Sequence, residues 1–160
     1  MTTRTTATAV PLARLLAMAF RLLIDGLHER LAERGWRDLR PAFGFVLLGL
    51  RGGPATLREL TELLGTSKQA VSKLVEAMVE TGYVKRRTHP DDARAKTVQL
   101  TQRGHRLLAA VEEIYDELER QWADVIGRER IEGIREDLDA VLRSAYGEAL
   151  PAVRPLGPEA

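Results

Sequence analysis

Cysteine is absent from this chain of 160 residues, which excludes disulfide bonds, thiolate metal ligands and sensing by cysteine oxidation. Long apolar runs are absent too, because none approaches the roughly 20 residues that a membrane-spanning helix needs. The first ten residues are rich in threonine and lack the charged start, the leucine-rich block and the cleavage site of a secretion signal. These absences predict a soluble protein of the cytoplasm.

The groups that catalysis requires are also sparse. The three histidines are scattered, and no His-Glu-x-x-His pair, nucleophile elbow or phosphate-binding loop occurs. Asp91 and Asp92 could act as an acid and base pair, but their place on a turn beside Arg94 favours a structural role. The sequence therefore predicts no enzyme, no metal ion and no cofactor.

Two short helices are predicted in the middle of the chain. Leucines recur at helical spacing from Leu57 to Leu64, and Gly65 follows as a residue that tolerates a left-handed turn. Ser67 can begin a second helix by accepting a hydrogen bond from the backbone N–H of Ala70. The apolar residues of this second helix fall three or four apart and face the core: Val71, Leu74, Val75 and Met78. Its opposite edge is therefore polar and free to bind.

A β-hairpin is predicted next, with strand-like runs at residues 83–88 and 96–101 joined by residues 89–94. Thr81 and Gly82 end the preceding helix. In the second run Val98 and Leu100 alternate with polar residues, which predicts one packed face and one solvated face. The hairpin would form a wing beside the helix pair, with Arg94 near its tip.

These residues make the chain resemble the MarR family of winged helix-turn-helix transcription regulators. The resemblance rests on four short runs: Leu-Gly-Thr-Ser-Lys-Gln-Ala-Val-Ser-Lys from Leu64 to Lys73, Gly82-Tyr83-Val84 leading into Arg86, Asp92-Ala93-Arg94 with Lys96, and Leu-Thr-x-x-Gly from Leu100 to Gly104. It implies a mainly α fold with a small β-hairpin wing, flanked by long N- and C-terminal dimerisation helices. A helix-turn-helix pattern alone would be weaker, because unrelated helix pairs match it by chance.

Apolar spacing predicts a long helix on each side of the wing. The first ends at Gly35, the second begins at Thr101, and a short helix between them has Pro41 in its first turn. Together with the resemblance this predicts five segments: a flexible N-terminus (1–10), a helical dimerisation region (11–35 and 101–147), a winged helix-turn-helix domain (36–100) and a flexible tail (148–160). The terminal helices hold more apolar surface than the module needs. A second copy of the chain is the expected partner.

Charge is distributed unevenly along a chain whose net charge is only +1. Residues 66–106 contain nine Lys or Arg and four Asp or Glu, a net charge of +5, whereas residues 107–150 contain five and twelve, a net charge of −7. The basic segment coincides with the predicted helix edge and wing, as expected where DNA phosphates approach. The competing interpretation is an ordinary solvated face.

The expected DNA contacts divide by type. Gln69 could read adenine, and Ala70 could touch a thymine methyl group. Arg94 suits a narrow minor groove, held in place by a charge-assisted bond to Asp92. The remaining candidates could contact bases or phosphates or anchor the wing: Ser67, Lys68, Ser72, Lys73, Arg86, Arg87 and Lys96. The function predicted is a homodimeric regulator of a palindromic operator, most simply a repressor. Two alternatives stay open: a winged-helix protein-interaction module, and sequence-indifferent architectural DNA binding.

The resemblance also implies a pocket for a small effector between the first helices and the long helix. Five residues lie in segments that would line it: His28, Trp36, Arg40, Phe43 and Phe45. Each is also explained as an ordinary core or surface residue. Ligand binding would relieve repression only if the ligand prefers one spacing of the two recognition helices.

Overall fold

A computed structural model describes residues 9–88, 90–94 and 96–148 of the chain. The elements of the described residues are α1 (Leu12–Glu33), α2 (Phe43–Gly49), β1 (Ala55–Thr56), α3 (Leu57–Leu64), α4 (Lys68–Glu80), β2 (Val84–Thr88), β3 (Lys96–Leu100), α5 (Gln102–Ile126) and α6 (Arg128–Tyr146). The predicted fold class, mainly helical with a small winged sheet, is confirmed. The segments predicted to be flexible, 1–10 and 148–160, lie outside the described residues except at positions 9, 10 and 148.

The helix pair α3 and α4 forms as the local sequence predicts. Gly65 ends α3 with φ 61°, in the left-handed region, and the Ala70 N–H donates to Ser67 Oγ at 3.1 Å to cap α4. A capping box that the sequence analysis did not identify begins α3, with Glu59 N–H donating to Thr56 Oγ1 at 3.1 Å and Thr56 N–H donating to Glu59 Oε2 at 2.7 Å. Both ends of the connection between the two helices are therefore fixed.

The sheet contains a strand that was not expected. Its order is β1-β3-β2, with Ala55 opposite Val98 and Val84 opposite Leu100, and both pairings are antiparallel. Because β3 lies between two neighbours, Thr97 is only 8% exposed, and the prediction that Thr97 and its face are solvated is wrong at this residue. The two-residue β1 has no periodic pattern, so the sequence could not reveal it.

The long helix α5 begins directly against the base of the wing. Thr101 Oγ1 accepts from the Gly104 N–H at 3.1 Å and donates to the Gly82 carbonyl at 2.5 Å, so this hydroxyl caps α5 and binds the end of the α4 turn. A Cβ atom at Gly104 would overlap the carbonyl oxygen of Tyr83. Glycine is thus required where α5 meets the wing.

Aromatic residues fill the core under the wing. Tyr83 is fully buried, with the ring of Trp36 centred 6.2 Å away and that of Phe43 6.1 Å away. The Arg103 guanidinium lies 4.9 Å from the centre of the Tyr83 ring and donates to its hydroxyl at 3.4 Å. This cluster joins the wing, the α1–α2 connection and the first turn of α5.

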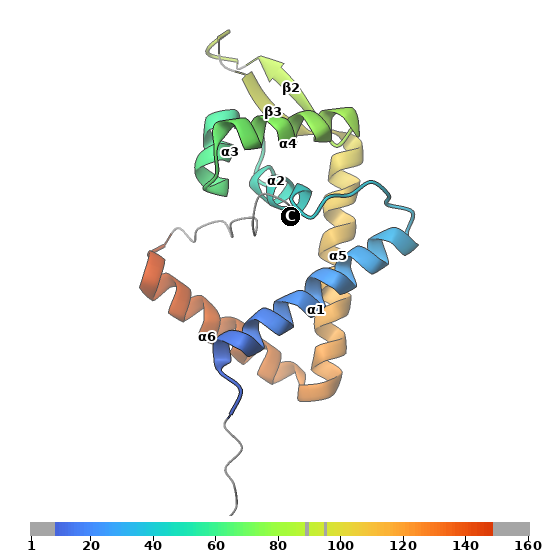
Figure 1. The fold of residues 1–160 in the computed structure, drawn as a ribbon, viewed down its shortest axis with the longest axis vertical. Coiled ribbons are helices and arrows are strands. Elements are labelled where there is room, and N and C mark those ends of the chain that lie inside the picture. The colour runs from blue at the N-terminus through green and yellow to red at the C-terminus, as the bar shows by residue number, and fades with distance from the viewer. Residues whose placement is uncertain (1–8, 89, 95, 149–160) are drawn as a thin grey trace, which may run out of the picture.

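Figure 1 shows how the elements are arranged: α2, α3, α4 and the sheet form one end of the molecule, and α5 runs from it to the other end, where α1 crosses α5 and α6 folds back. The first helix ends near Gly35, as predicted, with φ 86° there. Pro41 was expected in the first turn of α2 and lies instead in the turn before it. Among the described residues no helix is both long enough and apolar enough to cross a bilayer.

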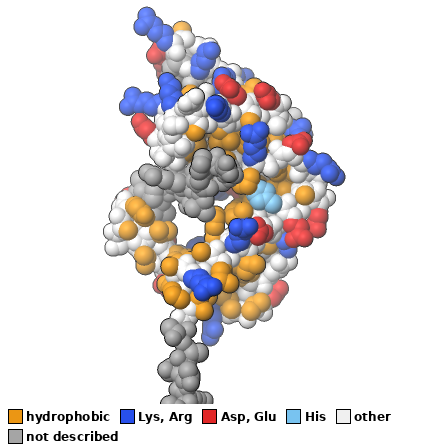
Figure 2. Space-filling model, in the orientation of Figure 1, with side chains coloured by type: hydrophobic (Ala, Val, Ile, Leu, Met, Phe, Trp, Pro, Cys, Tyr) orange, Lys and Arg blue, Asp and Glu red, His pale blue; other side chains and the backbone are white. Residues whose placement is uncertain are grey.

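The helices at the far end leave much apolar surface uncovered. On α1 the large apolar side chains that are at least 41% exposed are Leu12, Leu15, Leu16, Met18, Phe20 and Leu22, and on α6 those at least 37% exposed are Ile134, Leu138, Val141, Leu142 and Tyr146. Figure 2 shows hydrophobic side chains gathered over this end. Within the described part of the chain, no other segment covers them.

Candidate nucleic-acid interface

The outer edge of α4 carries the polar residues predicted to meet DNA. Ser67, Lys68, Gln69, Ala70 and Lys73 are exposed, and Ser72 is half-buried. On the opposite side of the same helix the side chains of Val71, Val75 and Met78 are fully buried in the core. The core therefore holds α4 in a fixed orientation and leaves its polar edge accessible.

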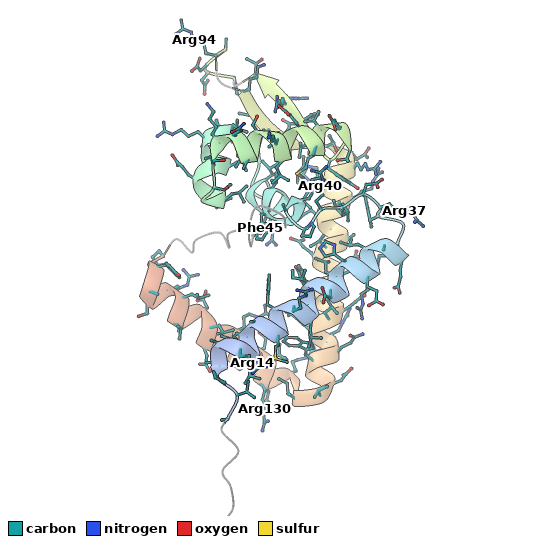
Figure 3. All side chains as sticks on the ribbon, viewed as in Figure 1. Arg14, Arg37, Arg40, Phe45, Arg94 and Arg130 are labelled. Atoms are coloured by element: carbon teal, nitrogen blue, oxygen red, sulfur yellow. The ribbon has the colours of Figure 1, made fainter. Side chains whose placement is uncertain are left out.

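Arg94 lies at the tip of the wing, pointing away from the body of the molecule (Figure 3). The Arg94 backbone N–H donates to Asp92 Oδ1 at 2.9 Å, a turn in which the carboxylate fixes the backbone of the loop. Asp92 thus contacts the main chain of Arg94, and the charge-assisted bond expected between the two side chains does not form, since among the described residues the Arg94 guanidinium has no ion-pair partner. Two residues of this loop, His89 and Ala95, lie outside the described part of the chain.

At the base of the wing, cationic side chains border a small hollow. It has a volume of about 120 Å³ and is lined by Leu57, Ser72, Arg86, Lys96 and Val98, so it brings together α3, α4, β2 and β3. Arg86 also lies 3.9 Å from the carboxylate of Glu76 on α4. This exposed ion pair links β2 of the wing to α4.

Positive charge collects on this end of the molecule. Arg87 and Lys96 are exposed, and Figure 2 shows Lys and Arg side chains around the wing end. On α5 and α6, hydrogen bonding to Glu119 raises the pKa of Arg135, and burial raises the pKa of Tyr115. The candidate interface therefore combines Lys and Arg side chains with neutral hydrogen-bonding groups.

None of the five residues expected around an effector pocket lines either of two hollows on the described surface. Phe43 is 2% exposed and packs edge-on against Tyr83 in the core. His28, Trp36 and Phe45 are half-buried, and Arg40 is exposed. A hollow of about 280 Å³ lies elsewhere, bordered by the α2–β1 connection, β3 and the first turn of α5, and none of the five lines it.

The described side chains that could hold a metal ion are not clustered. Within residues 9–88, 90–94 and 96–148, no three His, Asp or Glu side chains lie close enough together to hold a metal ion. The Asp91 and Asp92 pair, considered above as an acid and base, lies on the wing loop, with Asp92 bonded to the main chain of that loop.

Two features of the interface were missed from the sequence. The Thr56-x-x-Glu59 capping box was recognisable as a local pattern, since a threonine is followed three residues later by glutamate. The pairing of Glu76 with Arg86 was not recognisable from the sequence, because it depends on how β2 packs along α4.

Comparison with known proteins identifies the family that the middle of the chain resembles. A family model described as the MarR family matches residues 45–95, which include the helix pair and most of the wing. No curated protein sequence matches the chain. The resemblance predicted from the short runs between Leu64 and Gly104 is thus confirmed for this segment.

Solved structures of similar fold cover most of the chain. A mutant of MarR from E. coli complexed with operator DNA is 24% identical with a TM-score of 0.67, covering 83% of this chain and 94% of that one. A transcriptional regulator from Thermotoga maritima is 24% identical with a TM-score of 0.64, covering 87% and 99%. A mutant of MepR from S. aureus bound to an oligodeoxyribonucleotide is 21% identical with a TM-score of 0.60, covering 86% and 99%. These matches establish the winged-helix fold.

Proposed function

We propose that this MarR-like chain is a transcription regulator that binds a palindromic DNA operator as a homodimer in the cytoplasm. The observation that carries the proposal is the placement of the polar edge of α4 and the arginine-bearing wing at one end of the molecule, with uncovered apolar helices at the other. Two of the similar structures contain DNA, which supports the same assignment. The first end would read DNA, and the second would pair two copies.

Dimerisation follows from the apolar faces of α1 and α6. A monomer with this much exposed apolar surface on two helices would associate, because burying it is favourable by about 25 cal/mol per Å². A symmetric dimer brings two copies of α4 to successive turns of the major groove, about 34 to 36 Å apart. A palindromic operator is the DNA sequence that matches this symmetry.

The contacts of each copy would divide between affinity and specificity. Gln69 can make two hydrogen bonds to adenine and Ser72 can bond a base or a phosphate, whereas Lys68 and Lys73 supply charge along the same edge. Arg94 extends from the wing tip away from the body of the molecule (Figure 3), from where it would enter the adjacent minor groove. Base reading is thus assigned to α4, and minor-groove and phosphate binding to the wing.

The regulator is proposed to repress, with a small ligand relieving repression. A ligand could do so only by binding more tightly to a dimer in which the two α4 helices are wrongly spaced for the operator. The ligand-binding residues stay a prediction.

Recovery of genomic fragments bound by the purified protein tests the proposal, followed by gel shifts on the recovered site at two salt concentrations. We expect an inverted repeat with half-sites one helical turn apart, and affinity that falls steeply as salt rises. A protein-interaction module would produce no shift at either concentration. An architectural protein would produce a shift that any competitor DNA abolishes equally.

A further inference from the structure

Three arginines from two different elements converge on the middle of α5. Arg34, at the end of α1, binds Glu113 at 3.1 Å and Glu117 at 2.5 Å, and Arg51, just after α2, binds Glu112 at 3.0 Å. Arg30 of α1 lies 3.8 Å from Glu117, and it donates to Gln121 Oε1 at 3.1 Å. We call this set the α5 clamp: Arg30, Arg34, Arg51, Glu112, Glu113 and Glu117.

The clamp holds α5 from two sides. Glu113 and Glu117 are four residues apart and share one face of the helix, so one guanidinium can bridge both. Glu112 points about 100° away from Glu113 around the helix and meets Arg51 there. The end of the dimerisation helix α1 and the end of α2, which belongs to the winged module, are thereby attached to the same two turns of α5.

This network differs from the isolated surface pairs of the molecule. An exposed pair contributes little, because solvent screens it and two side chains lose freedom. Within the clamp, the side chains of Arg30, Arg34 and Glu117 are 22%, 33% and 37% exposed, and each makes at least two polar contacts. Glu113 is 69% exposed, and the Arg51–Glu112 pair, at 63% and 46%, is more exposed, so that link to the module is the weaker one. Close packing reinforces the α1 side of the clamp, since a Cβ at Gly26 would lie 2.9 Å from Leu118, so α1 and α5 touch one turn away.

We propose that the α5 clamp sets the angle between the dimerisation helices and the winged module, and through it the half-site spacing that the dimer accepts. The distance along α5 from the clamp to the start of the helix is about 18 Å, at a rise of about 1.5 Å per residue. A rotation of about 10° there moves the module by about 3 Å, close to the 3.4 Å rise of one base pair. The clamp residues are positioning residues, distant from DNA.

The inference rests on the proposed function, and its test uses three operators: the recovered palindrome, and versions with one base pair added or removed at the centre. For the wild-type dimer we expect the recovered spacing to be preferred by about 10-fold or more, comparable to the cost of a mismatched base pair. In the triple variant Glu112→Gln, Glu113→Gln and Glu117→Gln, which removes both the α1 and the α2 links, that preference should fall below about 3-fold, while affinity for the best spacing changes less. A residue that only stabilised the fold would weaken all three operators equally.

Arg21→Gln is the matched control. Arg21 lies on α1 and pairs with Asp25 four residues on, at 3.2 Å, so its loss removes an ion pair but no link between helices. We expect this variant to keep the wild-type spacing preference. If the clamp variant also keeps it, the inference is overturned while the proposed function stands. If the wild-type protein binds no palindrome, the proposed function fails and the inference fails with it.

A distance measurement provides a second readout that does not depend on operator choice. The chain has no cysteine, so Glu80→Cys, at the exposed end of α4, introduces a single site for a spin label in each protomer. Double electron–electron resonance across the dimer should give one narrow distance distribution, and a broader one when Glu112→Gln, Glu113→Gln and Glu117→Gln are added. Equal widths in both proteins would contradict the assignment of a positioning role.

Discussion

The two ends of the molecule differ in how far the apolar side chains of their helices are buried. In the winged module the inward face of α4 is sealed, with Val71, Val75 and Met78 at 0% exposure. On the terminal helices residues of the same kind are open to solvent, with Leu12 at 68% and Val141 at 66%. The core side of α4 is therefore closed by residues of the same chain, whereas the apolar faces of α1 and α6 are not, and the proposed dimer would cover them. The difference teaches that the two ends suit different partners, since one presents polar and cationic side chains and the other apolar ones.

Breaking the apolar end should have the largest effect. Leu16→Glu together with Leu142→Glu places charge on the uncovered faces of α1 and α6, and we expect the dimer to dissociate and operator affinity to fall by roughly 100-fold or more, as paired binding is lost. Sedimentation would report the mass, and gel shifts the affinity. Leu48→Glu is the control, since Leu48 is 57% exposed on α2 within the module. A dimer that survives the double substitution would contradict the comparison.

Breaking the join between the two ends should cost stability. Gly104→Ala forces a methyl group into the carbonyl of Tyr83, and we expect the free energy of unfolding to fall by about 3 kcal/mol, the upper range for overpacking. The control is Gly133→Ala, also inside a helix but with nothing within 4 Å of the added Cβ, which should stabilise the protein by about 0.5 to 1 kcal/mol. Thermal unfolding at one fixed protein concentration distinguishes the two, and equal shifts would refute the packing argument.

Neutralising the wing should weaken DNA binding without changing assembly. With Arg94→Ala we expect about 10-fold lower affinity for every sequence, and a plot of log affinity against log salt whose slope falls by about one unit. Arg130→Ala removes an arginine from the opposite end of the molecule (Figure 3) and should change neither quantity. Equal behaviour of the two variants would remove Arg94 from the interface.

The smallest effect is expected at a single base. Gln69→Ala should relax preference at one operator position by roughly 1 to 3 kcal/mol and leave the others unchanged, because an amide reads one adenine. Binding selections with randomised half-sites would measure this. A uniform loss over all positions would mean that Gln69 positions α4 and does not read sequence.

Local signals predicted the elements of the site, and long-range packing determined the rest. Gly65, Ser67 and Thr101 mark helix ends because their roles depend on neighbours within four residues, and the structure has all three there. Burial of Thr97 depends on the pairing of β1 with β3, whose partners are more than 40 residues apart in the sequence. The pairing of Arg34 with Glu117 spans 83 residues, and no sequence pattern indicates it. Placement of the polar edge was thus predictable, and the clamp that orients it was not.

Hydroxyl-radical footprinting of the recovered operator tests the central claim most directly, that paired copies bind one duplex through α4 and the wing. The account predicts protection arranged with two-fold symmetry, its two halves centred about 10 to 10.5 base pairs apart, and loss of the flanking minor-groove protection with Arg94→Ala. A single unpaired block of protection, or protection that Arg94→Ala leaves intact, would contradict it.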